Sequence, residues 1–191
     1  MEIKRCPWCL GNDVYVQYHD EEWGVPVKDS RKLFEHLILD GAQAGLSWLT
    51  ILKRRDGYRA AFDNFDPEKM ARWTDKKIER LMGDERIIRN RLKIKSAVTN
   101  AKIFLQMEES GNKNFSGWLW DWTGGAPIIN KFTNMDELPA ATPLSTRISA
   151  ELKKLGWTFV GPTIVYAFMQ ASGLVNDHLV DCFRYKEVKA N

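Results

Sequence analysis

The residues able to bind a metal stand near the two ends of this chain, and that separation constrains the fold more than any other feature. The segment VNDHLVDC holds His178, one of three histidines, and Cys182, one of three cysteines. In a helix, this i, i+4 spacing lets both side chains reach one ion. Two cysteines and two histidines complete a tetrahedral zinc shell. A zinc site would therefore join the two ends of the chain, and the partners available upstream are Cys6, Cys9, His19 and His36.

Spacing alone leaves the choice among these partners open. Cys6 and Cys9 form C-x2-C, a chelating or redox spacing, but a redox pair normally begins a helix in a βαβ unit and none is evident. His36 falls among the leucines of a helical pattern, which favours an ordinary helix residue. Four available ligands favour a closed structural site over a catalytic zinc with three ligands and an open position. For each residue alone, a buried cysteine or a hydrogen-bonded histidine is the simpler interpretation.

The hydrophobic pattern predicts an all-α fold. Apolar residues recur at helical spacing after Asp29-Ser30, and Pro67 and Thr74 stand where further helices would begin. Helices are also predicted from Trp48 to Arg55 and, as the longest, from Ile87 to Met107. Alternating strand patterns are weak. No repeat, low-complexity tract or linker divides the 191 residues, so they are enough for one domain with a substantial core.

Composition excludes some classes of protein and leaves others open. The N-terminal residues MEIKRCPWCLGND lack the apolar stretch of a signal peptide, and no run of about 18 apolar residues could span a membrane. Three cysteines make a poor disulfide framework, which favours a reducing cytoplasm. The net charge of +3 permits a nucleic-acid partner without requiring one. Eight tryptophans are more than expected, and a cluster of them could form a stacking surface.

The stretch LKKLGWTFVGPTIVYAFMQASG predicts two helices joined by a tight turn. Gly156 would end the first helix in the left-handed conformation, and Gly161-Pro162 would begin the second, which stops at Gly173. Free N–H groups at the start of the second helix suit an anion such as a phosphate, and Lys153 lies just before the turn. Basic residues also gather within 53–55 and 86–95, where they could neutralise phosphates. An ordinary helical hairpin and solvated helix faces are the simpler alternatives.

Several of these segments together resemble one family, the DNA-3-methyladenine glycosylases of type I. The matching strings are RCPW, YHDEEWGVP, LILDGAQAGLSWLTILKRR, FVGPTIVYAFMQASGLVNDH and the final His-x3-Cys, and they extend almost from end to end. The resemblance implies the helix-hairpin-helix glycosylase fold as a single domain over 1–191, with room for two helical lobes. It also implies a structural zinc that packs segments 1–23 and 174–191 together. The implied ligands are Cys6, His19, His178 and Cys182, with Cys9 as an extra cysteine.

The function implied by the resemblance is the hydrolytic removal of 3-methyladenine from alkylated double-stranded DNA by a monomer, which leaves an abasic site. Such an enzyme must turn the nucleotide out of the duplex into a pocket. The methylated nucleotide is cationic, and a cation over an aromatic face gains roughly 0.5–2 kcal/mol. No lysine in the matching motifs stands as a Schiff-base nucleophile, so strand cleavage is not expected. The expected aromatic box is Trp8, Tyr18, Trp23 and Trp48, and the expected DNA contacts are Gly45, Leu46, Lys153, Gly161 and Thr163.

Asp40 is the catalytic and base-binding acid that the resemblance implies, since it could accept a hydrogen bond from the lesion and balance its charge. The family typically has Glu at this position, and Asp is one methylene, about 1.5 Å, shorter. Ala42 likewise stands where the family usually has Gln. These departures leave a catalytically weak or inactive DNA-binding module as the alternative function, and a helix end before Gly41 as the alternative role. Asp177, beside His178, is expected to orient that zinc ligand.

Overall fold

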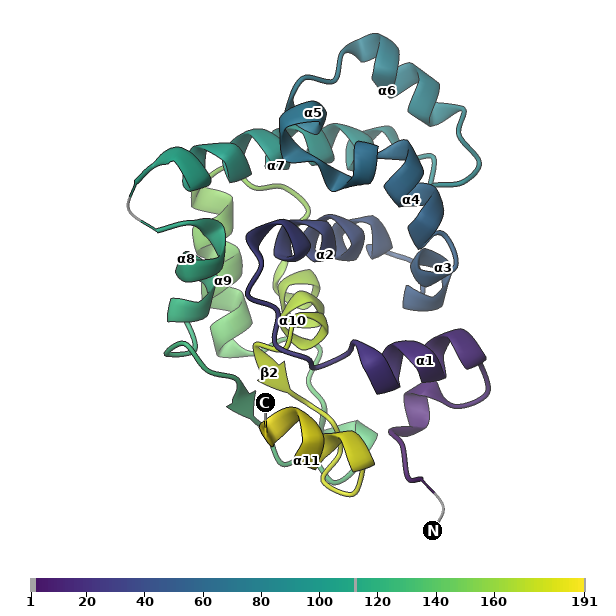
Figure 1. The fold of residues 1–191 in the computed structure, drawn as a ribbon, viewed down its shortest axis with the longest axis vertical. Helices are drawn as coiled ribbons and strands as arrows, with labels where there is room; N and C mark the ends of the chain where they lie inside the picture. The colour runs from purple at the N-terminus through teal and green to yellow at the C-terminus, as the bar shows by residue number, and fades with distance from the viewer. Residues whose placement is uncertain (1–2, 112, 191) are drawn as a thin grey trace.

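The computed structural model describes residues 3–111 and 113–190, and its helices confirm the all-α class (Figure 1). The helices are α1 (Asp13–Glu21), α2 (Ser30–Gln43), α3 (Trp48–Leu52), α4 (Arg55–Ala61), α5 (Pro67–Ala71), α6 (Asp75–Met82), α7 (Arg91–Glu109), α8 (Phe115–Asp121), α9 (Pro143–Lys154), α10 (Pro162–Ala171) and α11 (Phe183–Ala190). Short 3-10 helices are η1 (Pro7–Cys9), η2 (Asp63–Phe65) and η3 (Met135–Glu137). The strands β1 (Ile128–Ile129) and β2 (Val175–Asn176) form one short parallel pair. Among the described residues, no helix combines the length and apolarity needed to cross a bilayer.

Side-chain caps set most helix boundaries. Asp29 caps α2 through a hydrogen bond from a backbone N–H of the first turn, as the sequence predicts. The side chain of Asn90 caps α7, so the longest helix begins at Arg91, later than predicted. The helix predicted over 48–55 ends at Leu52, and α4 follows as a separate helix. These differences move boundaries only, and each predicted helix is present.

Helix α2 lies at the centre of the molecule. Figure 1 shows it between α7 on one side and α10 on the other, and α9 packs against α10 while α5 packs against α7. The large core between these helices includes Phe34, Phe104 and Phe168, each at most 2% exposed. Both ends of the chain lie on the α10 side of α2 (Figure 1), where the backbone N–H of Phe183 donates to the carbonyl oxygen of Lys4 at 2.9 Å. Residues from the two ends of the chain therefore lie together, which a metal site with ligands near both ends requires.

The predicted pair of helices with a tight turn is α9, α10 and the residues between them. Gly156 ends α9 with φ +96°. Asn100 of α7 holds the turn, because its amide nitrogen donates to Thr158 O at 3.0 Å and its oxygen accepts from Thr158 N at 2.9 Å. Gly161 precedes α10 with an ordinary φ of −63°, and a Cβ atom there would meet nothing within 4 Å. Packing within the described chain thus gives no reason for glycine at 161, and the surface beside it is open.

Candidate functional site

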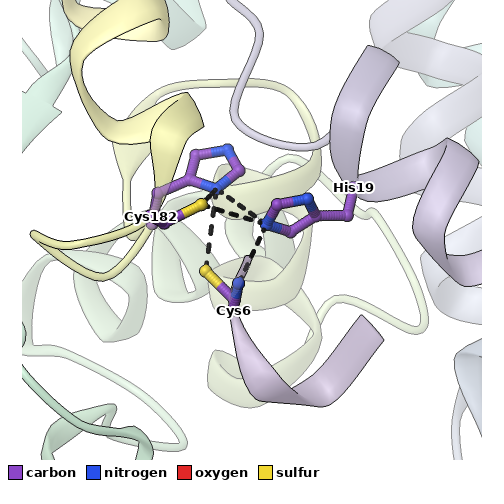
Figure 2. Close-up of side chains that lie close together, drawn as sticks. Cys6, His19 and Cys182 are labelled. Carbon is purple, nitrogen blue, oxygen red and sulfur yellow. Dashed lines mark hydrogen bonds between the residues drawn. The ribbon is translucent and has the colours of Figure 1, made fainter. Parts of the chain in front are cut away.

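Four side chains from the two ends of the chain meet in one buried cluster. Figure 2 shows Cys6, His19 and Cys182 pointing toward one another, the first two from the N-terminal segment and the third from the C-terminal one. His178 completes the cluster, and the four ligand atoms lie within 4.8 Å of one another. Relative exposure is 2% for Cys182 and 0% for the other three residues. These four residues are the ligand set that the family resemblance implies.

The spacing of the four atoms fits a tetrahedral metal site. The imidazole nitrogens His19 Nε2 and His178 Nδ1 are 3.2 Å apart. Cys182 Sγ lies 3.4 and 3.6 Å from these nitrogens, and Cys6 Sγ lies 3.8 Å from His178 Nδ1. A tetrahedral ion with bonds of about 2.0–2.1 Å to nitrogen and about 2.3 Å to sulfur would separate two nitrogens by about 3.3 Å and nitrogen from sulfur by about 3.6 Å. The cluster could therefore hold such an ion with little rearrangement.

The outer nitrogen of each imidazole is held by a hydrogen bond that leaves the inner nitrogen available as a ligand. His178 Nε2 donates to the carbonyl oxygen of Trp23 at 2.9 Å. His19 Nδ1 donates to Asp20 Oδ1 at 2.7 Å, and Arg5 donates to the same carboxylate at 2.9 Å. Although burial opposes it, the bonds from Arg5 and His19 hold the pKa of Asp20 below its usual value. Partners of this kind fix the tautomer and orientation of a metal-binding imidazole.

The pKa values of the two thiols of the cluster are shifted in opposite directions. A hydrogen bond from the Cys6 thiol lowers the pKa of Cys182, and burial opposes this shift. The same hydrogen bond, together with burial, raises the pKa of Cys6. The backbone N–H of Leu179 also donates to Cys6 Sγ at 3.4 Å, which suits a sulfur that carries negative charge. Binding of a cation favours the thiolate form of both cysteines.

Two expectations about this cluster are wrong, and two hold. His178 and Cys182 do not share a helix: they lie in the irregular segment between β2 and α11, and the bend of the chain brings them together. Asp177 does not orient His178, because its carboxylate bonds to side chains of α10 instead. Cys9 and His36 lie outside the cluster, as expected. Burial lowers the pKa of His36 to about 4, which keeps that helix residue neutral.

A cavity of about 230 Å³ adjoins the cluster of two cysteines and two histidines, and aromatic rings form much of its wall. Trp8 meets Trp23 edge-on with ring centroids 5.0 Å apart, and the Tyr18 ring lies 5.6 Å from that of Trp48. The Trp23 ring also lies 4.7 Å from the imidazole of His178. All four residues of the expected aromatic box therefore line one cavity. Trp23 also contacts His178 of the Cys/His cluster, so the cluster supports the wall that Trp23 forms.

Asp40 lines the same cavity from α2. The side chain is 3% exposed, and its Oδ2 atom is buried without a hydrogen-bond partner among the described residues. Burial raises the pKa of this carboxyl well above its usual value. Because α2 continues to Gln43, Asp40 does not end the helix. A buried acid without a partner costs stability, and such groups gather where a ligand supplies the missing partner.

The chain matches known proteins over most of its length. The family model described as methyladenine glycosylase matches residues 8–185. This chain belongs to the methyladenine glycosylase family. The DNA-3-methyladenine glycosylase 1 of Escherichia coli K12 is 48% identical over 183 residues, which cover 96% of this chain and 97% of the relative. A crystal structure of a 3-methyladenine DNA glycosylase I matches with a TM-score of 0.92 at 48% identity and covers 94% of this chain and 98% of its own. A variant of such an enzyme in complex with 3-methyladenine matches with a TM-score of 0.90 at 37% identity, over 94% of this chain and 96% of its own.

Sequence reasoning missed part of the cavity wall of this methyladenine glycosylase. Tyr15 and Gln43 each lie three residues from a predicted cavity residue on the same helix, so helical periodicity could have found them. Met135 and Leu138 come from η3 and its C-terminal cap, and Gln170 comes from the last turn of α10. No local pattern in these segments signals a cavity, because only the tertiary packing brings them to it.

A lysine holds the loop that follows α2 in this glycosylase. Lys93 Nζ donates to the carbonyl oxygens of Ala42 and Ala44 at 2.8 and 2.6 Å. Burial lowers the pKa of Lys93. Its charge complements the negative end of α2, beside which Gly45 takes φ +77° and Leu46 is 40% exposed. Lys93 therefore supports the expected DNA-facing loop instead of contributing to a free basic patch.

Most other basic residues of the 86–95 segment are also paired, which removes them from any free basic surface. The ion pairs are Arg86 with Asp84, Arg89 with Glu85, and Arg91 with Glu79. By contrast, Lys153 and Thr163, which flank the turn between α9 and α10, are exposed. A Cβ atom at Gly161, before α10, would meet nothing within 4 Å. This turn, more than the basic segment, presents groups that a phosphate could reach.

Proposed function

We propose that this chain is a monofunctional DNA glycosylase that turns 3-methyladenine out of alkylated double-stranded DNA and removes it by hydrolysis, leaving an abasic site. The observation that carries the proposal is the cavity that aromatic rings share with the buried carboxyl of Asp40, whose Oδ2 atom has no hydrogen-bond partner among the described residues. At about 230 Å³, the cavity is below the range of roughly 300–1,000 Å³ for drug-sized ligands and suits a single base. The names of the relatives and the relative bound to 3-methyladenine support the same activity.

The aromatic wall favours a cationic base over a neutral one. Methylation at N3 makes adenine cationic while it is attached to the sugar, and each well-placed ring adds about 0.5–2 kcal/mol to its binding. Tyr18 and Trp48 lie close enough to act as neighbouring walls of one slot. Unmodified adenine is neutral and does not gain this binding energy. The cavity would thus select damage by charge as well as by shape.

Asp40 would add a second preference for the charged base. Burial raises the pKa of this carboxyl and so favours its protonated form, but a cation beside it favours the ionised form. The ionised carboxylate then accepts a hydrogen bond from the base and balances its charge. The base leaves as a neutral molecule, so the glycosidic bond is already weak and water can attack the sugar with little acid catalysis.

We further propose that the buried Cys6, His19, His178 and Cys182 cluster holds one zinc ion with a structural role. Four protein ligands close the tetrahedral shell, and two thiolates with two imidazoles match the donors that zinc prefers. Zinc would supply a covalent tie between the ends of the chain. All three cysteines are free of disulfides, which suits the reducing cytoplasm as the compartment.

The turn between α9 and α10 is our proposed contact with the DNA backbone. Lys153→Ala should weaken binding to an undamaged duplex and make the slope of log affinity against log salt shallower by about 1, because one phosphate contact is lost. Gly161→Val should weaken binding without loss of fold, since a Cβ there meets nothing and φ is ordinary. Salt-dependent fluorescence anisotropy measures both effects. Lys186 of α11 is exposed, so Lys186→Ala is a matched control. An equal loss of DNA affinity in this control would show that the turn does not contact the DNA.

The proposed activity is tested by incubating the pure protein with a methylated duplex and an unmethylated one. We expect abasic sites in the methylated duplex alone, and no strand breaks until heat or alkali converts those sites. Abasic sites no more frequent than in the no-enzyme control would leave the DNA-binding module as the function. Strand breaks that appear without heat or alkali would contradict a monofunctional enzyme.

A further inference from the structure

A buried hydrogen-bond network lies directly behind one wall of the cavity. Asp177 is 1% exposed, and three side chains converge on its carboxylate. Tyr166 Oη and Gln170 Nε2 lie 2.6 and 2.8 Å from Oδ2, and Asn130 Nδ2 lies 2.6 Å from Oδ1. Of these three partners, only Gln170 also lines the cavity. The network therefore connects a buried acid to one polar side chain that a bound base would touch.

The chemistry of the network decides which end of the Gln170 side chain faces Asp177. Burial, followed by the hydrogen bond to Asp177, raises the pKa of Tyr166, so the phenol keeps its proton and donates it. A carboxylate accepts hydrogen bonds and donates none. The carboxamide of Gln170 must then turn its NH₂ group, not its oxygen, toward Asp177. The remaining atom, Oε1, makes no hydrogen bond with any of the described residues.

The backbone around Gln170 is fixed as firmly as its side chain. Its carbonyl oxygen accepts from Gly24 N at 3.0 Å, which ties the end of α10 to the segment after α1, and from Gly173 N at 3.3 Å in the turn that ends α10. With both the backbone and the amide nitrogen held, the position of Oε1 is set before any ligand enters. Pre-organised acceptors bind more tightly than mobile ones, because no side-chain entropy is lost on binding.

We propose that Gln170 is a specificity-determining residue whose Oε1 accepts a hydrogen bond from the amino group of the extruded purine, and that Asp177 is the positioning residue that fixes this orientation. The inference rests on the proposed function and identifies the amino group as the part of the base that Gln170 recognises. An amino N–H on a cationic purine is a stronger donor than one on a neutral purine, so this contact would also favour the methylated base. A base without an amino group would leave Oε1 buried and unpaired, at a cost.

The test compares two free bases that differ only in the amino group, 3-methyladenine and 3-methylpurine, by isothermal titration calorimetry. We expect the wild-type protein to bind 3-methyladenine about three- to tenfold more tightly than 3-methylpurine. In Gln170→Met, which keeps the length of the side chain but has no amide, the ratio should fall toward one. Gln106→Met makes the same substitution at an exposed position of α7 and should keep the wild-type ratio.

Asp177→Asn tests the positioning role separately. An asparagine can accept or donate, so the Gln170 amide is free to turn, and the preference for the amino group should fall as it does in Gln170→Met. Melting temperature and metal content serve as checks that a merely structural change has not caused the loss. A preference that stays at the wild-type ratio in both variants would overturn the inference. Failure of the wild-type protein to bind 3-methyladenine at all would instead overturn the proposed function, so the two failures are distinguishable.

Discussion

Replacing Cys182 with serine should lower the melting temperature of this protein by about 10 °C or more. The substitution leaves the zinc proposed here with three ligands, because a serine hydroxyl does not deprotonate to replace the thiolate. Structural zinc sites contribute folding free energy directly, on the order of 10 kcal/mol in small domains. Loss of even about 4 kcal/mol corresponds to a shift of about 8–16 °C in a chain of this size. The cluster also joins the two ends of the chain, so its loss should release both of them.

Cys9→Ser provides the matched control for that experiment. Cys9 is also fully buried, but its Sγ donates to the carbonyl oxygen of Cys6 at 3.1 Å, a bond that a serine hydroxyl can keep. We expect one zinc per chain by elemental analysis in the wild type and in Cys9→Ser, and little in Cys182→Ser. A wild-type protein stripped of metal that melts at an unchanged temperature would refute the structural role. Metal-free protein that keeps its melting temperature but loses base release would support a catalytic zinc.

Asp40→Asn should reduce the release of 3-methyladenine by about a hundredfold or more, the loss typical of removing one well-placed electrostatic partner in an active site. Asparagine nearly matches the size of aspartate but cannot become negative beside the cationic nucleotide. The rate is measured in single turnover, where base release is not masked by slow dissociation of the product. Asp56→Asn, at a side chain that is 98% exposed, makes the same change away from the cavity and should keep the wild-type rate. A wild-type rate in Asp40→Asn would show that the cavity does not act through this carboxyl.

The same substitution should change how stability depends on pH. The folded-state pKa of Asp40 is raised by burial, so at low pH both folded and unfolded chains hold the proton and the carboxyl costs nothing in charge. As pH rises past about 4, the unfolded carboxyl ionises while the folded one stays neutral, and this group then lowers stability. Asparagine does not titrate. The melting temperature of Asp40→Asn relative to wild type should therefore rise from pH 4 toward neutral pH, and a flat difference would contradict the buried, protonated acid.

Features that depend on nearby residues in the sequence were predictable here. The helices that begin at Ser30 and Pro67 follow from a capping residue and a periodic apolar stripe, and both are present. The stop at Gly156 follows from the left-handed conformation that glycine tolerates, and it has φ +96°. The four-residue Cys/His cluster could be predicted only through the family resemblance, because spacing did not distinguish Cys6 from Cys9.

Features that depend on tertiary packing were not predictable. Asp177 stands next to His178 in sequence, yet its carboxylate faces α10, and the Trp23 carbonyl takes the role expected of it. Lys93 looks like one of several surface cations, but the end of α2 accepts its hydrogen bonds. The part of the cavity wall from η3 has no pattern of its own. In each case the contacting residue comes from a distant part of the chain, and local periodicity and spacing do not predict such contacts.

The most direct test of the account is to identify which bases this protein releases from one methylated duplex. Mass spectrometry of the released bases, against a no-enzyme control, should show 3-methyladenine well above its spontaneous release and no unmodified adenine. That result would follow from a cavity whose aromatic rings and Asp40 favour a cationic purine. Release of unmodified adenine at a similar rate, or no base above the control, would contradict it.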